Sequence, residues 1–296
     1  MKRKIDTLEN AFYKKYPKYY CVLTMWKEAN GELPTWENIT KATLTAFVDY
    51  LCEHKAQSSA KTYCAMFKSV LNTYSDQVEL PRGWEKALSV KNDASQSVFL
   101  TEDELRRIID YAPDTQTEAI VQQQFIVAAL TGARHSDAVT FSERNVSGSH
   151  IVYVSQKTHI KAEIPLSPIA ADILNLPFEG RTYRFTGSEY AGAYLKTVSD
   201  PTFNATIRRI CEICDINEEI RLYRRGEFVE GKKWEFVTSH TARKSFASNL
   251  YLRGADIYTI SRMLGHNSVE MTAQKYIVCP IRELSDEIQG YFSNFS

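Results

Sequence analysis

Apolar residues in the first 92 positions of the chain recur at the spacing of α-helices. One run begins near Thr40, and its apolar positions fall three and four residues apart: Leu44, Phe47, Val48 and Leu51. That spacing places side chains on a single helix face. Residues 58–76 repeat the pattern, and Pro17 is expected to kink or bound an earlier, aromatic-rich helix. Residues 1–92 therefore predict a helical domain.

A polar stretch at residues 91–97 interrupts the apolar pattern, and we assign residues 93–98 as a linker. Thr101, followed by Glu102 and Glu104, is typical of a capped helix start. A hydroxyl and early carboxylates suit the exposed amide groups of a first helical turn. A second domain is expected at residues 99–296.

The second domain mixes helical segments with two stretches that predict β-hairpins. Residues 149–167 alternate between apolar and polar positions and are rich in β-branched side chains, and the turn is expected at residues 157–160. Residues 221–239 predict a shorter hairpin turned by Gly226 or Gly231. The fold class predicted is mainly α with a small antiparallel β-sheet: a helical N-terminal domain followed by an α+β domain.

The composition is that of an ordinary globular protein and does not by itself indicate nucleic acid binding. The chain has 296 residues, of which 44% are hydrophobic and 24% charged. Its 36 basic and 36 acidic residues cancel. Residues 1–92 carry 14 basic and 10 acidic side chains, which leaves 36 − 14 = 22 and 36 − 10 = 26 for the rest. A DNA-binding function would require basic residues that are placed locally.

Several other classes of protein are disfavoured by the sequence. No apolar run approaches the roughly 20 residues that span a bilayer, and no apolar segment follows the basic residues at the N-terminus, as a secretory signal requires. The six cysteines show no disulfide framework, which fits a reducing cytosol. Cys211 and Cys214 form a lone C-x-x-C, which is weak support for zinc, so we expect no metal.

Individual polar residues in the second domain each have an ordinary explanation. Arg134 follows Gly132, which breaks an apolar run, and a salt bridge to Asp137 would account for it. His240 and Arg243, three residues apart, share one face of a helix start and could be a capped helix with a surface arginine.

Taken together, these residues form a set with a chemical meaning. The set comprises Arg134, Lys157, His240, Arg243, His266 and Tyr276. Two guanidinium groups can clamp the non-bridging oxygens of a phosphodiester. A lysine can protonate a leaving alkoxide, histidines can donate hydrogen bonds or move protons, and a tyrosine hydroxyl can be the nucleophile of a covalent phosphoenzyme. The cations neutralise the developing charge, so no cofactor is required.

The order and spacing of these motifs resemble the tyrosine recombinase (phage integrase) family across residues 99–296. The matching segments are ALTGARHSDAV, SQKT, SHTARKSFASNL and MLGHNSVEMTAQKY. The chain looks most similar to integrases of Bacteroides-type mobile elements. The helical N-terminal part looks like the core-binding domain of the family.

The resemblance implies a role for each residue of the set. Arg134 and Arg243 would hold the scissile phosphate, with His240 and His266 in support. Lys157 would be the general acid for the departing 5′ oxygen, and Tyr276 the nucleophile that forms a 3′-phosphotyrosine. Asp137 takes the place of an acidic residue that is more often Glu, and Lys244 stands where many members have His.

The spacing between His266 and Tyr276 is explained if one helix ends at Gly265 and the next, starting at Met271 and Thr272, returns the tyrosine to the same phosphate. The tail at residues 281–296 carries an apolar helical stripe, which could pack on its own chain or on a neighbouring protomer. The first helix begins within about ten residues of Met1, so by comparison with the family we expect no arm-binding domain.

Other basic residues are candidates for phosphate-backbone contacts, which position DNA without specifying its sequence. They are Lys55, Lys61 and Lys68 in the first domain, and Arg224, Arg225, Lys232 and Lys233 in the second. For all of them a solvated surface side chain is the simpler explanation.

Three functions remain open at this point. The first is a cytoplasmic, nucleoid-associated recombinase that integrates, excises or inverts a mobile element. Its expected partners are duplex DNA with inverted-repeat core sites, a homo-tetramer on synapsed DNA, and accessory DNA-bending proteins. The second is a nicking-closing enzyme like the type IB topoisomerases. The third is a DNA-binding protein with an inactive site, which the intact six-residue set disfavours.

Overall fold

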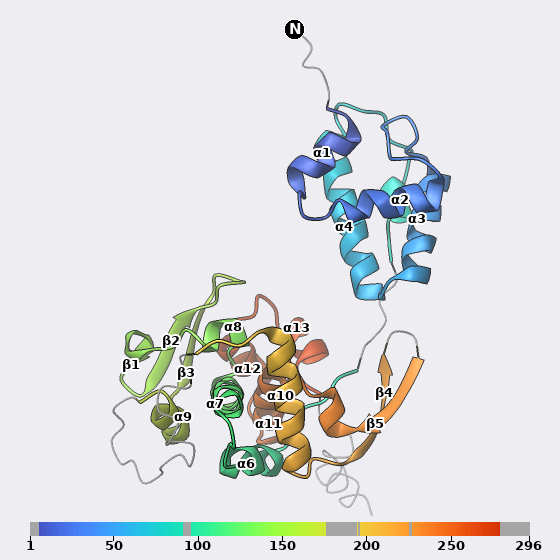
Figure 1. Cartoon of the computed structure of the whole chain (residues 1–296). Helices are drawn as coiled ribbons and strands as arrows, with labels where there is room; N and C mark the ends of the chain where they lie inside the picture. Colours follow the sequence, from blue (N-terminus) through green and yellow to red (C-terminus); the bar gives the residue numbers. More distant parts are fainter. Residues whose placement is uncertain (1–5, 91–95, 176–193, 195, 225–226, 279–296) are drawn as a thin grey trace, which may run out of the picture. The chain divides into compact units, whose positions relative to one another are not determined.

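The computed structural model of the chain describes residues 6–90, 96–175, 194, 196–224 and 227–278 (Figure 1). Contacts divide the chain into two compact units, Met1–Ser95 with Tyr223–Glu227 and Gln96–Leu222 with Phe228–Ser296. The described residues are mainly helical, with one three-stranded and one two-stranded sheet. The predicted fold class is confirmed.

The N-terminal unit is built of helices. They are α1 (Leu8–Lys15), α2 (Cys21–Asn30), α3 (Lys41–His54), α4 (Gln57–Tyr74) and the short α5 (Trp84–Ala87). Pro17 falls between α1 and α2, so it bounds the first helix. The Thr40 hydroxyl accepts a hydrogen bond from the Thr43 amide, and the Thr43 side chain accepts one from the Thr40 amide in return. This capping box starts α3 where the sequence predicted.

Aromatic side chains from three of these helices form the centre of the N-terminal core. Trp26 on α2 stacks on Phe67 of α4 with ring centroids 4.9 Å apart, and Phe47 of α3 lies 5.3 Å from Trp26. All three side chains are fully buried. Burial of such large apolar surfaces is the main stabilising contribution in a domain of this size.

The C-terminal unit is organised around one helix that is buried along nearly its whole length. This helix is α7 (Gln116–Thr131), and α10 (Asp200–Ile213) and α11 (Ser239–Leu252) pack against it (Figure 1). The remaining helices are α6 (Glu102–Asp110), α8 (His135–Ala138), α9 (Pro168–Ile173), α12 (Ile257–Met263) and α13 (Val269–Lys275), with 3₁₀ turns η1 (Glu143–Asn145) and η4 (Lys233–Phe236).

Two helix boundaries of the C-terminal unit follow from local sequence signals. Thr101 caps α6 through a capping box with Glu104, as its sequence predicted. Gly132 ends α7 in the left-handed region with φ 64°, where glycine avoids the steric cost of a Cβ atom.

The three-stranded sheet contains the hairpin that carries Lys157. Strands β1 (Val146–Ser147), β2 (His150–Val154) and β3 (Lys161–Pro165) are antiparallel in the order β1-β2-β3. Val154 of β2 faces Lys161 of β3. The turn therefore lies between these residues and contains Lys157, as the alternation pattern predicted.

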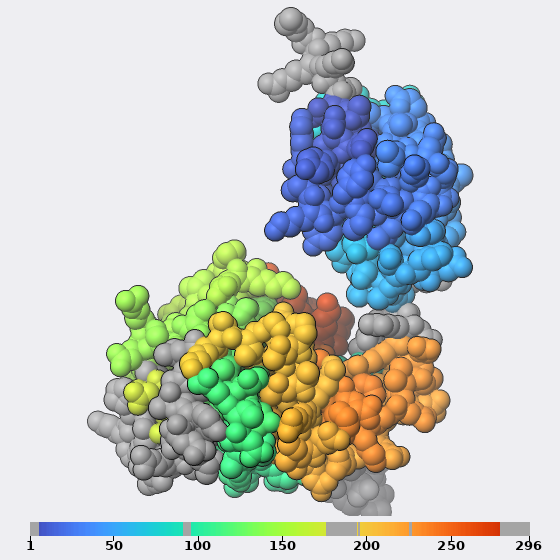
Figure 2. Space-filling view, in the orientation of Figure 1, coloured from blue at the N-terminus to red at the C-terminus, as the bar shows by residue number. Residues whose placement is uncertain are grey.

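The second hairpin consists of β4 (Glu219–Arg224) and β5 (Glu227–Lys232), which form the two-stranded sheet. Gly231 lies inside β5 and is therefore excluded as the turn, and Gly226, the alternative, lies outside the described residues. In the face shown in Figure 2, α10 and this hairpin reach the surface of the unit. The hairpin is therefore a solvent-facing element, as its polar sequence suggested.

Some of the sequence predictions lie outside the described residues. These are the linker up to residue 95, Arg225, Gly226 and the C-terminal tail from residue 279 onward. Val98, the last residue assigned to the linker, is already buried in the core of the C-terminal unit. Among the helices in the described ranges, none is long and apolar enough to cross a bilayer.

Candidate active site

The guanidinium group of Arg243 is buried at the centre of the site. Only 1% of the residue is exposed. Nη1 donates to the Gly132 carbonyl oxygen at 2.7 Å, and Nη2 donates to the Leu264 carbonyl oxygen at 2.6 Å and to His266 Nε2 at 2.7 Å. Nε is buried and has no hydrogen-bond partner among the described residues. Burial lowers the pKa of Arg243, although an arginine remains a cation at neutral pH.

Gly132 makes this arrangement sterically feasible. A Cβ atom on Gly132 would lie 2.4 Å from Cδ1 of the Phe246 ring and 2.9 Å from Cδ2 of Leu264. Both distances are shorter than van der Waals contact. The glycine thus lets the end of α7 approach α11 closely enough for its carbonyl oxygen to accept from Arg243.

Arg134, the second arginine of the set, is half-buried and precedes α8. Its Nη1 donates to Ser155 Oγ at 2.7 Å, and Ser155 Oγ donates to Asp137 Oδ2 at 3.0 Å. Asp137 Oδ1 accepts from the Gln156 amide at 3.1 Å. The salt bridge between Arg134 and Asp137 that seemed the simplest explanation is not formed, because the Ser155 hydroxyl lies between the two groups.

His266 is a neutral imidazole with a defined tautomer. An arginine can only donate, so Nε2 of His266 must accept from Arg243. Nδ1 then carries the proton and donates to Thr272 Oγ1 at 2.8 Å. Burial and the nearby Arg243 and Arg134 cations lower the pKa of His266 to about 3. Both ring nitrogens are therefore engaged in holding Arg243 and the start of α13.

Tyr276 lies against this group, directly after α13. Its ring is 4.4 Å from the His266 ring and 5.3 Å from the His240 ring, and the guanidinium carbon of Arg243 lies 5.2 Å from the Tyr276 ring centre. Ser248 Oγ donates to the Tyr276 carbonyl oxygen at 3.2 Å. Only 7% of the tyrosine is exposed.

The return of Tyr276 to the site follows the predicted two-helix path, with one difference. Helix α12 ends at Met263, and Gly265 turns the chain with φ 61°. Helix α13 begins at Val269 and not at Met271, because Ser268 caps it by accepting from the Met271 amide. The ten-residue spacing brings the tyrosine and the histidine together.

His240 and Lys157 complete the set at its solvent side. The pKa of His240 is lowered to about 4 by loss of water around the ring and by the cations Lys244, Arg243, Arg134 and Lys157. Both the His240 ring and the Lys157 side chain retain exposed surface.

Two residues of the site, Ser155 and Thr272, were given no role from the sequence; they hold Asp137 and His266. Lys244, which the sequence did single out, donates to Ser97 Oγ. Ser155 lies inside the SQKT segment, but a small polar residue gives no sequence signal of its own. Its importance depends on which side chains fold against it.

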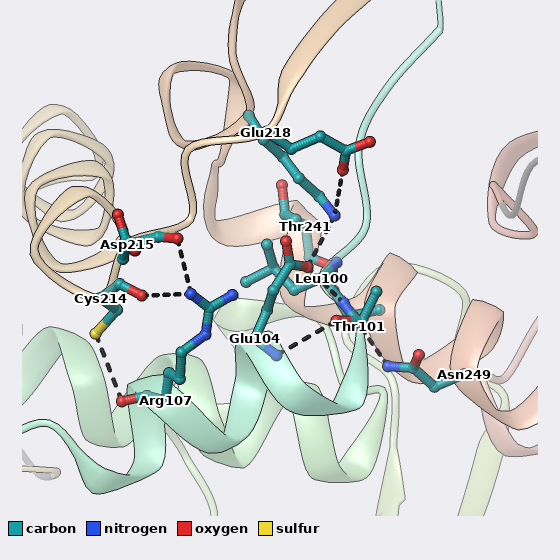
Figure 3. Close-up of polar contacts among 11 residues, drawn as sticks. Leu100, Thr101, Glu104, Arg107, Cys214, Asp215, Glu218, Thr241 and Asn249 are labelled. Atoms are coloured by element: carbon teal, nitrogen blue, oxygen red, sulfur yellow. Dashed lines mark hydrogen bonds and ion pairs between the residues drawn. The ribbon is translucent and has the colours of Figure 1, made fainter.

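The predicted phosphate contacts in the second hairpin differ in their surroundings. Lys233 is 6% exposed and lies 2.8 Å from Glu104 Oε2 and 3.7 Å from Glu218 Oε2; Figure 3 shows both carboxylates in one polar cluster. A buried ammonium group neutralised in this way is a structural ion pair, so the prediction for Lys233 was wrong. Lys232 pairs with Glu219 at 2.8 Å on the surface.

The polar cluster around Glu104 joins α6 to the rest of the unit. In Figure 3, Arg107 of α6 points toward the carbonyl groups of Cys214 and Asp215, and its Nη1 donates to them at 2.9 and 2.7 Å. Asn249 of α11 donates to the Leu100 carbonyl oxygen at 2.9 Å. The Arg107 bonds hold α6 against the end of α10, and the Asn249 bond holds Leu100 against α11, the helix that carries His240 and Arg243.

The comparisons with known proteins agree with this site. Residues 98–279 match the model of the phage integrase family. Because that match covers more than half of the chain, the protein belongs to the phage integrase family, the tyrosine site-specific recombinases that break and rejoin DNA through a covalent tyrosine intermediate.

Individual relatives are distant but extend over both units. The tyrosine recombinase XerC of Rickettsia prowazekii (strain Madrid E) is 23% identical over 273 residues, which cover 86% of this chain and 81% of that protein. A lambda integrase (75–356) dimer bound to a COC′ core site has a TM-score of 0.59 at 18% identity, covering 93% of this chain and 90% of the other. The Tn1549 transposon integrase in complex with transposon right end DNA has a TM-score of 0.61 at 12% identity, covering 96% and 99%. The two solved structures share the fold of this chain.

Proposed function

We propose that this chain recombines DNA of a mobile element, with Tyr276 as nucleophile and with Arg134, Lys157, His240, Arg243 and His266 around the scissile phosphate. The observation that carries the proposal is the state of the two arginines. Within the described residues neither guanidinium forms an ion pair, although one is almost fully buried. A buried cation that lacks a carboxylate partner is costly, and a phosphodiester supplies the missing negative charge.

The proposed chemical step gives each of these groups one role. The Tyr276 hydroxyl oxygen attacks phosphorus, the bond from phosphorus to the 5′ oxygen breaks, and a 3′-phosphotyrosine forms. Lys157 gives its proton to the leaving 5′ oxygen. The two arginines stabilise the charge on the non-bridging oxygens. The reverse attack by the 5′ hydroxyl of another strand rejoins DNA, because the phosphodiester bond energy is retained.

We assign the proton of Tyr276 to His240. Both nitrogens of His266 are already occupied by Arg243 and Thr272. His240 makes no hydrogen bond to the described residues, and loss of water around the ring together with the surrounding cations keeps it neutral by lowering its pKa to about 4. Its ring lies edge-on to Tyr276. A neutral imidazole in that position can accept a proton.

The rest of the proposal concerns DNA binding and assembly. Residues 1–92 would act as the core-binding domain, followed by a linker from residue 93 that ends before the buried Val98. In this domain Lys61 and Lys68 lie seven residues apart on α4 and so share a helix face. With Lys55 they are proposed phosphate contacts, together with Arg224, Arg225 and Lys232 of the second hairpin.

Lambda integrase structures include a dimer on a core site and a tetramer bound to a Holliday junction. By analogy we propose that four copies of this chain assemble on two synapsed duplexes with inverted-repeat core sites, assisted by accessory DNA-bending proteins. The element would be of the Bacteroides type, and the enzyme would act in the bacterial cytoplasm at the nucleoid.

Covalent trapping tests the proposal. Labelled duplexes from the DNA flanking the gene are incubated with wild type and with Tyr276→Phe, and adducts are separated on denaturing gels. We expect a protein-linked band that is absent for Tyr276→Phe and that maps the cleavage site. An adduct that persists in Tyr276→Phe would refute the assignment of Tyr276 as the nucleophile. Binding without any adduct on any flanking fragment would favour an inactive DNA-binding protein, and strand closure without exchange between duplexes would favour a topoisomerase-like activity.

A further inference from the structure

Ser155, at the end of strand β2, has its hydroxyl group between two charged side chains. We propose that Ser155 is a positioning residue that orients Arg134 toward the scissile phosphate, with Asp137 as the fixed anchor. The proposal rests on the proposed function, because it requires Arg134 to bind the phosphate.

The hydrogen bonds allow only one direction of donation. Arg134 Nη1 lies 2.7 Å from Ser155 Oγ, and an arginine can only donate. Ser155 therefore accepts from Arg134 and gives its single proton to Asp137 Oδ2 at 3.0 Å. Ser155 is fully buried, so water does not compete for these bonds. Two groups, the Ser155 hydroxyl directly after β2 and the Asp137 carboxylate of α8, thus fix one guanidinium nitrogen.

The indirect contact has a chemical advantage over a salt bridge. A guanidinium paired bidentately with a carboxylate would use two donors and have its charge neutralised at close range. Through Ser155, Arg134 uses Nη1 alone in the recorded contact. Its other donors can face the two non-bridging oxygens of a phosphodiester, while the Asp137 carboxylate stays one hydroxyl away.

The hydroxyl group of Ser155 is not needed to hold the turn that carries Lys157. Ser155 N donates to the Ile160 carbonyl oxygen at 3.0 Å, and His159 N donates to the Ser155 carbonyl oxygen at 2.8 Å. Gln156 N donates to Asp137 Oδ1 at 3.1 Å. All three are backbone donors that remain when the hydroxyl is removed. Loss of the hydroxyl should therefore affect Arg134 and leave Lys157 in place.

The test compares Ser155→Ala with Lys157→Ala on three duplexes that carry the mapped cleavage site. One has an ordinary phosphate. The second has a methylphosphonate, which removes the negative charge of one non-bridging oxygen and so reduces the need for an arginine. The third has a 5′-bridging sulfur, a leaving group that departs without a general acid. Single-turnover adduct formation is measured, with wild type and Tyr276→Phe in every series.

We expect Ser155→Ala to slow cleavage of the ordinary duplex about ten- to a hundredfold, the effect of losing one charge-assisted hydrogen bond. The difference in rate between Ser155→Ala and wild type should become smaller on the methylphosphonate duplex and remain on the duplex with the sulfur leaving group. For Lys157→Ala, the difference should remain on the methylphosphonate duplex and become smaller with the sulfur leaving group. Ser155→Cys, which keeps the shape but is a weak hydrogen-bonding group, should behave like Ser155→Ala and serves if the alanine variant does not fold.

Two results would overturn the proposal. The first is a rate equal to wild type for a folded Ser155 variant, and the second is a defect that is the same on all three duplexes or is relieved by sulfur. Failure of the proposed function is seen separately, because wild type would then form no adduct or Tyr276→Phe would still form one.

Discussion

Replacement of Gly132 by alanine should destabilise the C-terminal unit through two separable effects. The residue has φ 64°, and a left-handed conformation costs an L-residue about 1–2 kcal/mol. The added Cβ would also lie 2.4 Å from Cδ1 of the buried Phe246 ring and 2.9 Å from Cδ2 of Leu264. Overpacking of this kind costs about 1–3 kcal/mol. The two contributions sum to about 2–5 kcal/mol.

Gly254 provides a matched control for the backbone contribution. It follows α11 with φ 83°, and a Cβ atom there would meet nothing within 4 Å. Gly254→Ala should therefore lose only about 1–2 kcal/mol. The difference between the two variants isolates the clash with Phe246 and Leu264.

Equilibrium urea unfolding read by pulsed hydrogen exchange and mass spectrometry measures this difference. Peptides from α7 and α11 report on the C-terminal unit alone, which matters because a chain with two units need not unfold in a single transition. Gly132→Ala should also lose cleavage activity under conditions where it is folded, because the Gly132 carbonyl oxygen accepts from Arg243. Equal losses of stability in the two glycine variants, within about 0.5 kcal/mol, would refute the steric argument.

Three further predictions concern single side chains. Glu104→Gln removes the carboxylate that lies 2.8 Å from the buried Lys233 ammonium group. The free energy of unfolding of the C-terminal unit should fall by about 3 kcal/mol in the same urea assay, and a fall below about 1 kcal/mol would contradict a buried ion pair. The pKa of His266 is lowered from 6.5 to about 3 in the folded state, so its stabilising contribution is present above pH 6.5 and is lost as the pH falls toward 3, because the unfolded chain binds the proton first. Between pH 7 and pH 4.5 the loss in free energy of unfolding amounts to about 2–3 kcal/mol. The urea midpoint of His266→Gln should therefore change less between these pH values than that of wild type, and equal changes in the two proteins would exclude His266 as the source. Thr40→Ala removes the α3 cap, in which Thr40 and Thr43 bond reciprocally, and should cost the N-terminal unit about 1 kcal/mol, measured on α3 peptides, while α7 peptides stay unchanged.

Much of the fold could be predicted because its signals are local. The caps at Thr40 and Thr101, the break at Gly132 and the turn after Val154 each depend on residues a few positions apart. Helix and hairpin periodicity act over the same range. The start predicted for α13 was wrong because Ser268 supplied an earlier cap, and of the two glycines proposed for the second turn Gly231 is excluded because β5 continues through it.

The sequence by itself also supplied the hypothesis for which groups carry the chemistry, because the motifs around Arg134, Arg243, His266 and Tyr276 hold specific residue types at specific spacing. Only the tertiary structure decided how these groups are held. Arg243 is bound to a carbonyl oxygen 111 positions away, and Lys233 is neutralised by a carboxylate 129 positions away. Contacts over such distances arise from the packing of helices and leave no periodic trace in the chain. The same lysine therefore looks like a DNA contact in the sequence and is a buried ion pair in the fold.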